Sequence, residues 1–231
     1  MAIRSVAVPA RLRPTAPIAP DAILVGDPGR ALLLAQELLA QPKMSNHARG
    51  LWGYSGATAA GDALTIQSTG IGGPSAALVL ADLAELGVAR AIRVGTCVAL
   101  DGGVGLGELL VVERAIAAGG SAAAFGVEAG DAAAPDAELT DRLARILGDG
   151  AKRVAVASFD DHPAASAGGG ETIAADMQSA PLLARAGTLG VRVAALLIVA
   201  ESGAGEALAK DELEAAEKAA GRAAAGSLFS I

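Results

Sequence analysis

Three short glycine-containing loops carry the residues of this chain that are best suited to binding an anion. They cover residues 26–30 (GDPGR), 69–75 (TGIGGPS) and 93–96 (RVGT). Glycine lets backbone N–H groups approach an anion closely, and arginine adds a charged, two-pronged donor. Arg30, Arg93 and Thr96 therefore suggest a phosphate site. None of the loops has the spacing of a nucleotide P-loop or of a Gly-x-Gly-x-x-Gly dinucleotide loop.

The elements expected around these loops would bring them to one edge of a sheet. Apolar runs predict strands at residues 22–25, 63–68, 91–94, 109–112, 154–157 and 191–200. Ala/Leu-rich stretches predict helices at residues 31–39, 76–86, 136–147, 179–189 and 210–227. This alternation is typical of an α/β protein with a largely parallel sheet. Ligands bind at the carboxyl ends of the strands in such sheets, which is where the three loops begin.

Composition excludes several classes of protein. The 231 residues include 25 Asp and Glu against 18 Lys and Arg, a net charge of -7, and only 2% are aromatic. A nucleic-acid binder would need basic patches and aromatic stacking platforms. The single cysteine excludes a disulfide framework. The longest apolar run, residues 193–200, is far shorter than the roughly 20 residues that span a bilayer. We therefore expect a soluble, cytoplasmic protein.

In this order, the loops resemble those of the nucleoside phosphorylases, the purine nucleoside and uridine phosphorylases of the hexameric type. The matching stretches are LRPTAPIAPDAILVGDPGRA, NHARGLWGYSG, STGIGGPS and AIRVGT, with a weaker echo in ADMQSAPLLARAGTLGVRVAALLIVA. The resemblance implies one phosphorylase-like domain over residues 1–231. It also implies a three-layer α/β/α fold around a central mixed, largely parallel sheet.

The resemblance further implies an activity. Phosphate attacks the sugar C1′ of a nucleoside through a transition state with oxocarbenium character, and the products are a free base and (deoxy)ribose 1-phosphate. Phosphate is a co-substrate, and no metal or organic cofactor is required. The implied phosphate ligands are Gly26, Arg30, Arg93 and Thr96, together with Arg49 from a neighbouring subunit. The implied assembly is a homodimer or homohexamer with shared sites.

The same resemblance assigns residues to the nucleoside and to catalysis. Those expected around the nucleoside are Thr69, His162, Met177 and Gln178. Those expected to act in catalysis are Arg93, Gln178 and Glu201. The charged stretch at residues 210–218 is expected to be a solvated helix face with a Glu214–Lys218 pair.

The sequence departs from the family pattern around the nucleoside. Gln178 stands where the family has a ribose-binding glutamate, and Arg11 where it has a histidine that reaches a neighbour's sugar. His162 replaces an aromatic residue that stacks on the base, and Val98 replaces a glycine. The catalytic aspartate of the purine enzymes falls at or beside Gly203, next to Glu201. The glutamine and arginine with which the uridine enzymes read uracil fall near residues 166 and 168, where neither is present.

These departures leave three hypotheses open. The first is a nucleoside phosphorylase whose base is neither a standard purine nor uracil. The second is a non-catalytic or altered paralogue that binds phosphate or a phosphorylated metabolite. The third is a nucleosidase, which uses water, and the arginine set argues against it because a hydrolase needs no anion pocket for its nucleophile. His162 could stack on a base or be a surface residue of its loop.

Overall fold

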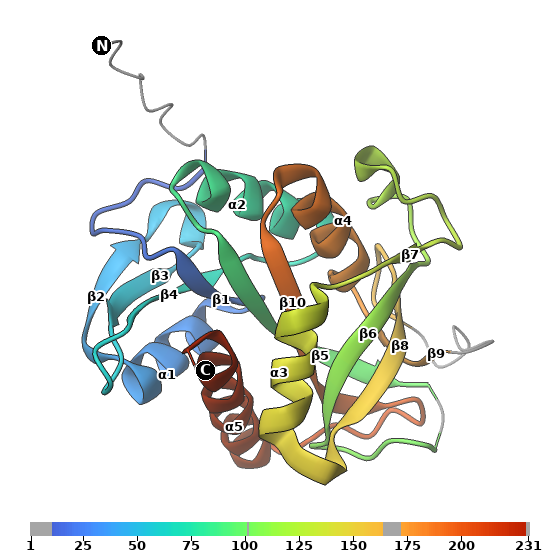
Figure 1. Ribbon diagram of the computed structural model, residues 1–231. Helices are drawn as coiled ribbons and strands as arrows, with labels where there is room; N and C mark the ends of the chain where they lie inside the picture. The colour runs from blue at the N-terminus through green and yellow to red at the C-terminus, as the bar shows by residue number, and fades with distance from the viewer. Residues whose placement is uncertain (1–10, 101, 164–171, 230–231) are drawn as a thin grey trace.

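The computed structural model describes residues 11–100, 102–163 and 172–229 (Figure 1). Within these ranges the strands are β1 Asp21–Val25, β2 Ala40–Asn46, β3 Gly53–Ala57, β4 Ala63–Ser68, β5 Arg90–Ala99, β6 Leu109–Ala117, β7 Ala132–Ala133, β8 Lys152–Ser158, β9 Thr172–Asp176 and β10 Arg192–Ser202. The helices are α1 Pro28–Leu38, α2 Gly73–Glu85, α3 Ala137–Leu147, α4 Ser179–Leu189 and α5 Lys210–Phe229. Residues 166 and 168, named above, lie outside the described residues.

All the described strands belong to one mixed sheet that partly closes on itself. Its order is β10-β6-β8-β9-β5-β1-β4-β3-β2, with β7 beside β6. Strand β10 also pairs with β5, so that β5, β9, β8, β6 and β10 form a closed, barrel-like ring. Half of the described strand pairings are antiparallel, and the expectation of a largely parallel sheet is wrong in that respect.

Helices cover both faces of this sheet, as the continuously apolar strands predicted. Helices α1, α3 and α5 pack on one face and α2 and α4 on the other (Figure 1). Successive residues of β1 point to opposite faces of the sheet. Ile23 packs in the same core as Leu34 of α1, and Leu24 packs in the same core as Leu80 of α2. Gly221 of α5 lies so close to Leu34 that a Cβ there would come within 2.6 Å of it.

Two of the three glycine-containing segments are loops that begin at one edge of the sheet. The last residue of β1, Val25, is in register with Ser68 at the end of β4 and with Val94 of β5. The third segment, residues 93–96, was expected to be a turn after a strand and instead lies within β5, which continues to Ala99 because it pairs with β10 over this stretch. The first loop turns into α1 at Asp27, whose carboxylate accepts a hydrogen bond from the backbone N–H of Arg30 at 2.8 Å.

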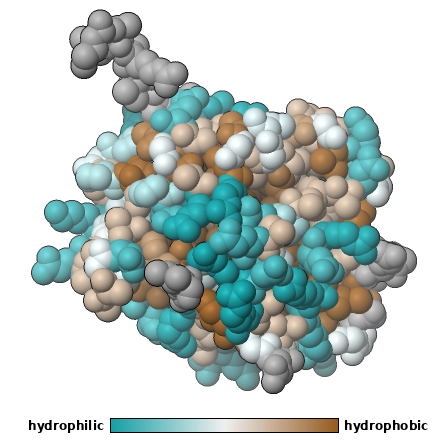
Figure 2. Space-filling view, in the orientation of Figure 1, coloured by the Kyte–Doolittle hydropathy of each residue, from teal (hydrophilic) through white to brown (hydrophobic). Residues whose placement is uncertain are grey.

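The outer surface of the helical layer is charged. Figure 2 shows hydrophilic side chains over α3, where Arg192 forms ion pairs with Asp136 at 2.8 Å and with Glu138 at 2.7 Å. Among the described residues, no helix combines the length and the apolar character that crossing a membrane requires.

Candidate active site

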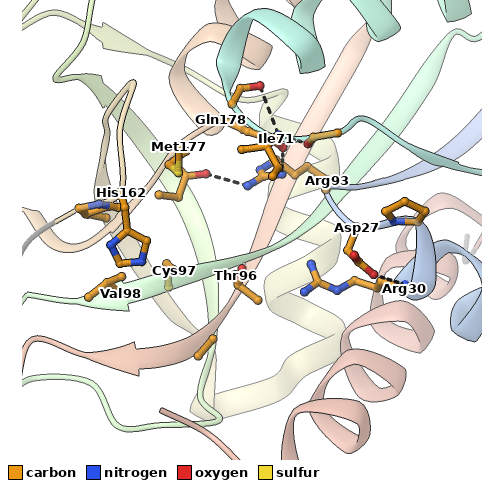
Figure 3. Close-up of a pocket in the computed structure, with 18 of the residues that line it drawn as sticks. Asp27, Arg30, Ile71, Arg93, Thr96, Cys97, Val98, His162, Met177 and Gln178 are labelled. Carbon is orange, nitrogen blue, oxygen red and sulfur yellow. Dashed lines mark hydrogen bonds and ion pairs between the residues drawn. The ribbon is translucent and has the colours of Figure 1, made fainter. Parts of the chain in front are cut away.

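A cavity of about 580 Å³ opens where the first two glycine-containing loops meet residues 93–98 of β5. Strands β5, β9 and β10 form its floor, and the first two loops close one side. The residues predicted from the sequence that line it are Gly26, Arg30, Arg49, Arg93, Thr96, His162, Met177, Gln178 and Glu201. Figure 3 shows Asp27 and Arg30 at one end and His162 and Val98 at the other, with Thr96 and Arg93 between them.

Thr69 is the one predicted site residue that does not line the cavity. Its side chain is buried, and its hydroxyl lies 3.0 Å from the carbonyl oxygen of Val25 and 3.2 Å from Oε1 of Gln178. The structure thus places Thr69 against Gln178 and not among the residues that line the cavity, and its contact with a nucleoside stays a prediction.

Arg30 lies in the first turn of α1 and is held from the opposite side by α5. Its Nε donates to Oε1 of Glu217 at 2.6 Å, and both side chains are about nine-tenths buried. Its Nη1 lies 3.5 Å from the carbonyl oxygen of Val94. Glu217 was expected on a solvated helix face and is instead buried beside the cavity. The Glu214–Lys218 pair predicted for the same helix is present at 2.8 Å.

Arg93 is buried on β5, and residues at the start of α4 orient it. Nη2 donates to Asp176 at 2.9 Å, Nη1 to Oε1 of Gln178 at 2.6 Å, and Nε lies 3.4 Å from the hydroxyl of Ser179. Asp176 is itself held by the hydroxyl of Ser158 and by the backbone N–H of Ser179. A guanidinium has five N–H donors, and three of those of Arg93 are used in these contacts, while the residue lines the cavity.

Arg49 is the exposed cation of the site. Its backbone is in the left-handed region at φ 60° and ψ 16°, a conformation that a residue with a Cβ rarely adopts and that is common at functional sites. Within the described part of the chain its guanidinium has no ion-pair partner. It lines both the main cavity and a second cavity of about 380 Å³, which it shares with Arg11, Arg13 and His47.

Arg11, which replaces the family's histidine, is tied to α2. Its Nη1 forms an ion pair with Asp82 at 2.8 Å, and the same buried carboxylate accepts the backbone N–H groups of Arg11 and Leu12. The segment that carries Arg11 is therefore anchored to the body of the protein.

A histidine and a carboxylate face each other at the far end of the cavity. Nε2 of His162 lies 3.3 Å from Oε2 of Glu201, and both side chains are substantially exposed to solvent. Glu201 follows a β-bulge, where the register of β10 against β5 shifts between Val199 and Glu201. The wall here includes Val98 and the buried Cys97, whose pKa is raised by burial, so that its sulfur stays a neutral thiol.

Residues 20–228 match the sequence pattern that defines the Phosphorylase superfamily. This chain belongs to that superfamily. The match spans the three glycine-containing segments at residues 26–30, 69–75 and 93–96 and the helix that carries Glu217. The resemblance inferred from the loop sequences is thereby confirmed.

Curated relatives give a narrower comparison. The chain is 37% identical over 99 residues to a purine nucleoside phosphorylase DeoD-type of Oceanobacillus iheyensis, covering 42% of each protein. It is 42% identical over 81 residues to a protein of the same description from Clostridium novyi, covering 35% of this chain and 34% of that one. The alignments thus span less than half the length of these relatives.

A solved structure supports the fold of this superfamily member over almost its whole length. The uridine phosphorylase from Vibrio fischeri ES114 superposes with a TM-score of 0.80 and covers 93% of both chains, at 23% sequence identity. At that identity the likeness concerns the fold, a phosphorylase-like α/β arrangement with a mixed sheet.

Proposed function

We propose that this phosphorylase-superfamily protein is a nucleoside phosphorylase. In the proposed reaction a phosphate oxygen attacks C1′ of the sugar and the bond between C1′ and the base nitrogen breaks. The electron pair of that bond leaves with the base, and the phosphate oxygen takes its place on C1′. The products are the free base and (deoxy)ribose 1-phosphate, and no metal or organic cofactor takes part. The observation that carries the proposal is one cavity with buried arginines toward one end and a His–Glu pair at the other.

Phosphate would bind among Gly26, Arg30, Arg93, Thr96 and Arg49. Arg30 and Arg93 are each paired with a buried carboxylate, so they enter the site already oriented and with their charge partly balanced. Their role is to position the nucleophile and to stabilise it electrostatically. The hydroxyl of Thr96 forms no hydrogen bond with the described residues and adds a donor at the same place.

The nucleoside would lie between Met177 and the His162–Glu201 pair. A departing base carries away an electron pair and needs a proton or a hydrogen-bond donor, which is a task for an acid. Glu201 and His162 are the solvent-exposed titratable groups that line this end of the cavity in the described residues, where the thiol of Cys97 is buried. We assign the acid to the His162–Glu201 pair, in which the imidazole carries the proton and the carboxylate orients and stabilises it, and leave the identity of the base to experiment.

The proposed assembly is a homodimer or a homohexamer of such dimers. Its basis is Arg49, which lies at the edge of the main cavity and also lines the neighbouring basic cavity. A side chain in that position is able to serve the site of an adjacent subunit as well as its own.

The deciding experiment measures base release from a panel of purine and pyrimidine nucleosides, with and without inorganic phosphate. Phosphate-dependent release from any member is the expected result, and it also identifies the base. Release that does not depend on phosphate would indicate a nucleosidase instead.

A second candidate function is a phosphate-binding protein without phosphorylase activity. It is favoured by Gln178, an uncharged residue whose amide is engaged within the protein. This function would be established, and the first overturned, if calorimetry shows binding of inorganic phosphate and no nucleoside of the panel releases its base.

A further inference from the structure

The side-chain amide of Gln178 is the meeting point of three parts of the site. Its Oε1 accepts a hydrogen bond from Nη1 of Arg93 at 2.6 Å and lies 3.2 Å from the hydroxyl of Thr69. Its Nε2 donates to the carbonyl oxygen of Gly70 at 2.6 Å and lies 3.3 Å from that of Gly72. The side chain is buried, although it lines the cavity.

The chemistry of the neighbours dictates how this amide is oriented. A guanidinium has only donors, so the atom beside Arg93 must be the oxygen of the amide. A carbonyl oxygen only accepts, so the atom between Gly70 and Gly72 must be the nitrogen. An amide of the opposite orientation would place N–H against N–H and oxygen against oxygen.

We propose that Gln178 is a positioning residue that joins Arg93 to the glycine loop of residues 70–72, rather than a ligand of the sugar. The inference rests on the proposed function, because it describes how the phosphate site of that reaction is held together. Gly70 and Gly72 have positive φ values of 75° and 80°, and the loop they form leads into α2. Through the amide, the buried guanidinium and this loop are kept at one fixed separation.

The N–H groups of the amide have no spare capacity for a substrate hydroxyl, and its oxygen is crowded by two protein groups. Both N–H groups of Gln178 point to carbonyl oxygens, and its oxygen faces Arg93 and Thr69. A sugar hydroxyl that bonded to Gln178 would have to displace one of these protein contacts, with little net gain. The side chain therefore contributes little to the difference between ribose and 2′-deoxyribose.

A carboxylate would not substitute for this amide, although it has the same shape. Glutamate at this position would place a negatively charged oxygen against the carbonyl oxygens of Gly70 and Gly72. The protonated carboxyl group, in contrast, has one O–H donor for Gly70 and one carbonyl oxygen for Arg93. The two protonation states thus differ in whether they preserve the link.

The experiment titrates wild type, Gln178→Ala and Gln178→Glu with inorganic phosphate by calorimetry, which requires no turnover. We expect Gln178→Ala to weaken phosphate binding about tenfold, the loss of one charge-assisted hydrogen bond to an oriented guanidinium. We expect Gln178→Glu to weaken it at about pH 8 and to recover at least part of the loss by about pH 5, where a glutamate begins to protonate. Each affinity is compared with wild type at the same pH.

The matched control is Gln36→Glu, which makes the same exchange at an exposed position of α1. We expect it to leave phosphate binding and its pH dependence as in wild type. A similar pH dependence in Gln36→Glu would overturn the inference, because the added charge alone would then explain it. Thermal melting of each variant shows whether the fold is kept, and if Gln178→Ala does not fold, the pH recovery of Gln178→Glu decides.

A substrate that the nucleoside panel identifies supplies a second readout. We expect Gln178→Ala to raise the KM for phosphate and to leave the rate ratio between ribonucleoside and 2′-deoxyribonucleoside within about twofold of wild type. Unchanged phosphate affinity, or a loss confined to the ribonucleoside, would overturn the inference and make Gln178 a sugar ligand. A wild type that binds phosphate but releases no base overturns the proposed function instead, and the calorimetric comparison still decides the role of Gln178.

Discussion

The guanidinium of Arg93 lies directly over Gly95, two residues further along β5. A Cβ at Gly95 would come within 2.5 Å of Nη2 and 2.6 Å of Cζ of Arg93, and within 2.9 Å of Leu197. Residues at i and i+2 of a strand share one face, so only a residue without a side chain leaves this space to the arginine. In the Arg-Val-Gly sequence, the glycine therefore leaves room for the buried arginine side chain to lie across its own strand toward the cavity.

Gly95→Ala tests this relationship. Because the new methyl group would lie between the guanidinium of Arg93 and the buried side chain of Leu197, Arg93 must move, and we expect phosphate affinity to fall at least tenfold in calorimetry. The control is Gly187→Ala in α4, where a Cβ meets nothing within 4 Å. That change should leave phosphate binding intact and stabilise the helix by up to about 1 kcal/mol. Normal phosphate binding by Gly95→Ala would contradict the role given to Arg93.

Glu217 balances the charge of Arg30 in a buried pair. Removing one partner of such a pair costs about 3–5 kcal/mol, so Glu217→Ala should lower the melting temperature markedly, and Glu217→Gln less. Bound phosphate supplies the missing negative charge, so it should raise the melting temperature of Glu217→Gln more than that of wild type. Glu214→Gln, on the exposed side of α5, should behave like wild type. Equal phosphate effects in both Gln variants would argue against this pairing.

The His162–Glu201 pair is the expected source of the proton for the departing base. We expect Glu201→Gln to lower kcat about 100-fold, in the range of general acid catalysis, and to leave phosphate affinity unchanged because the residue lies at the far end of the cavity. His162→Ala removes the imidazole that carries the proton and should lower kcat at least as much. Steady-state kinetics with the substrate found in the nucleoside panel supplies both numbers. An unchanged kcat in Glu201→Gln would assign the acid elsewhere.

Arg49 can serve its own site or that of an adjacent subunit, and subunit mixing separates the two. Arg30→Ala and Arg49→Ala should each be inactive alone. If the sites are shared, mixed oligomers contain sites with Arg30 from one subunit and Arg49 from the other, and activity returns in part. No recovery in oligomers shown to be mixed would mean that Arg49 acts only within its own chain.

Asp136 links stability to pH far from the cavity. Its carboxylate caps α3 through the N–H of Leu139 and pairs with Arg192, and the hydrogen bond from Arg192 holds the pKa of Asp136 below its ordinary value of 3.8. A folded-state pKa below the unfolded one means that the carboxylate stabilises at neutral pH and that this contribution is lost in acid. Asp136→Asn should thus unfold at lower urea than wild type at pH 7, with a difference that shrinks below about pH 4. A difference that does not change with pH would contradict the contribution of the charge, because asparagine can still cap α3 through its side-chain oxygen.

Much of the fold was readable from local patterns. The strand at residues 63–68 and the helix at residues 179–189 are found as predicted. Apolar runs, capping residues and glycines influence the backbone only within a few residues in the sequence, and parallel strands in register place the loops after β1 and β4 beside residues 93–96 of β5. The convergence of Arg30, Arg93 and Thr96 follows from these local rules.

The tertiary structure alone decided the rest. Strands β2 and β9 carry little of the expected apolar pattern, and the ring closure through β5 and β10 depends on pairing between distant segments. Glu217 lies 187 residues from Arg30 along the chain, and Gln178 lies 108 from Gly70. The sequence shows that Glu217 and Gln178 are polar. Whether such a side chain faces solvent, substrate or another buried group is set by how whole helices pack, and local periodicity does not encode that packing.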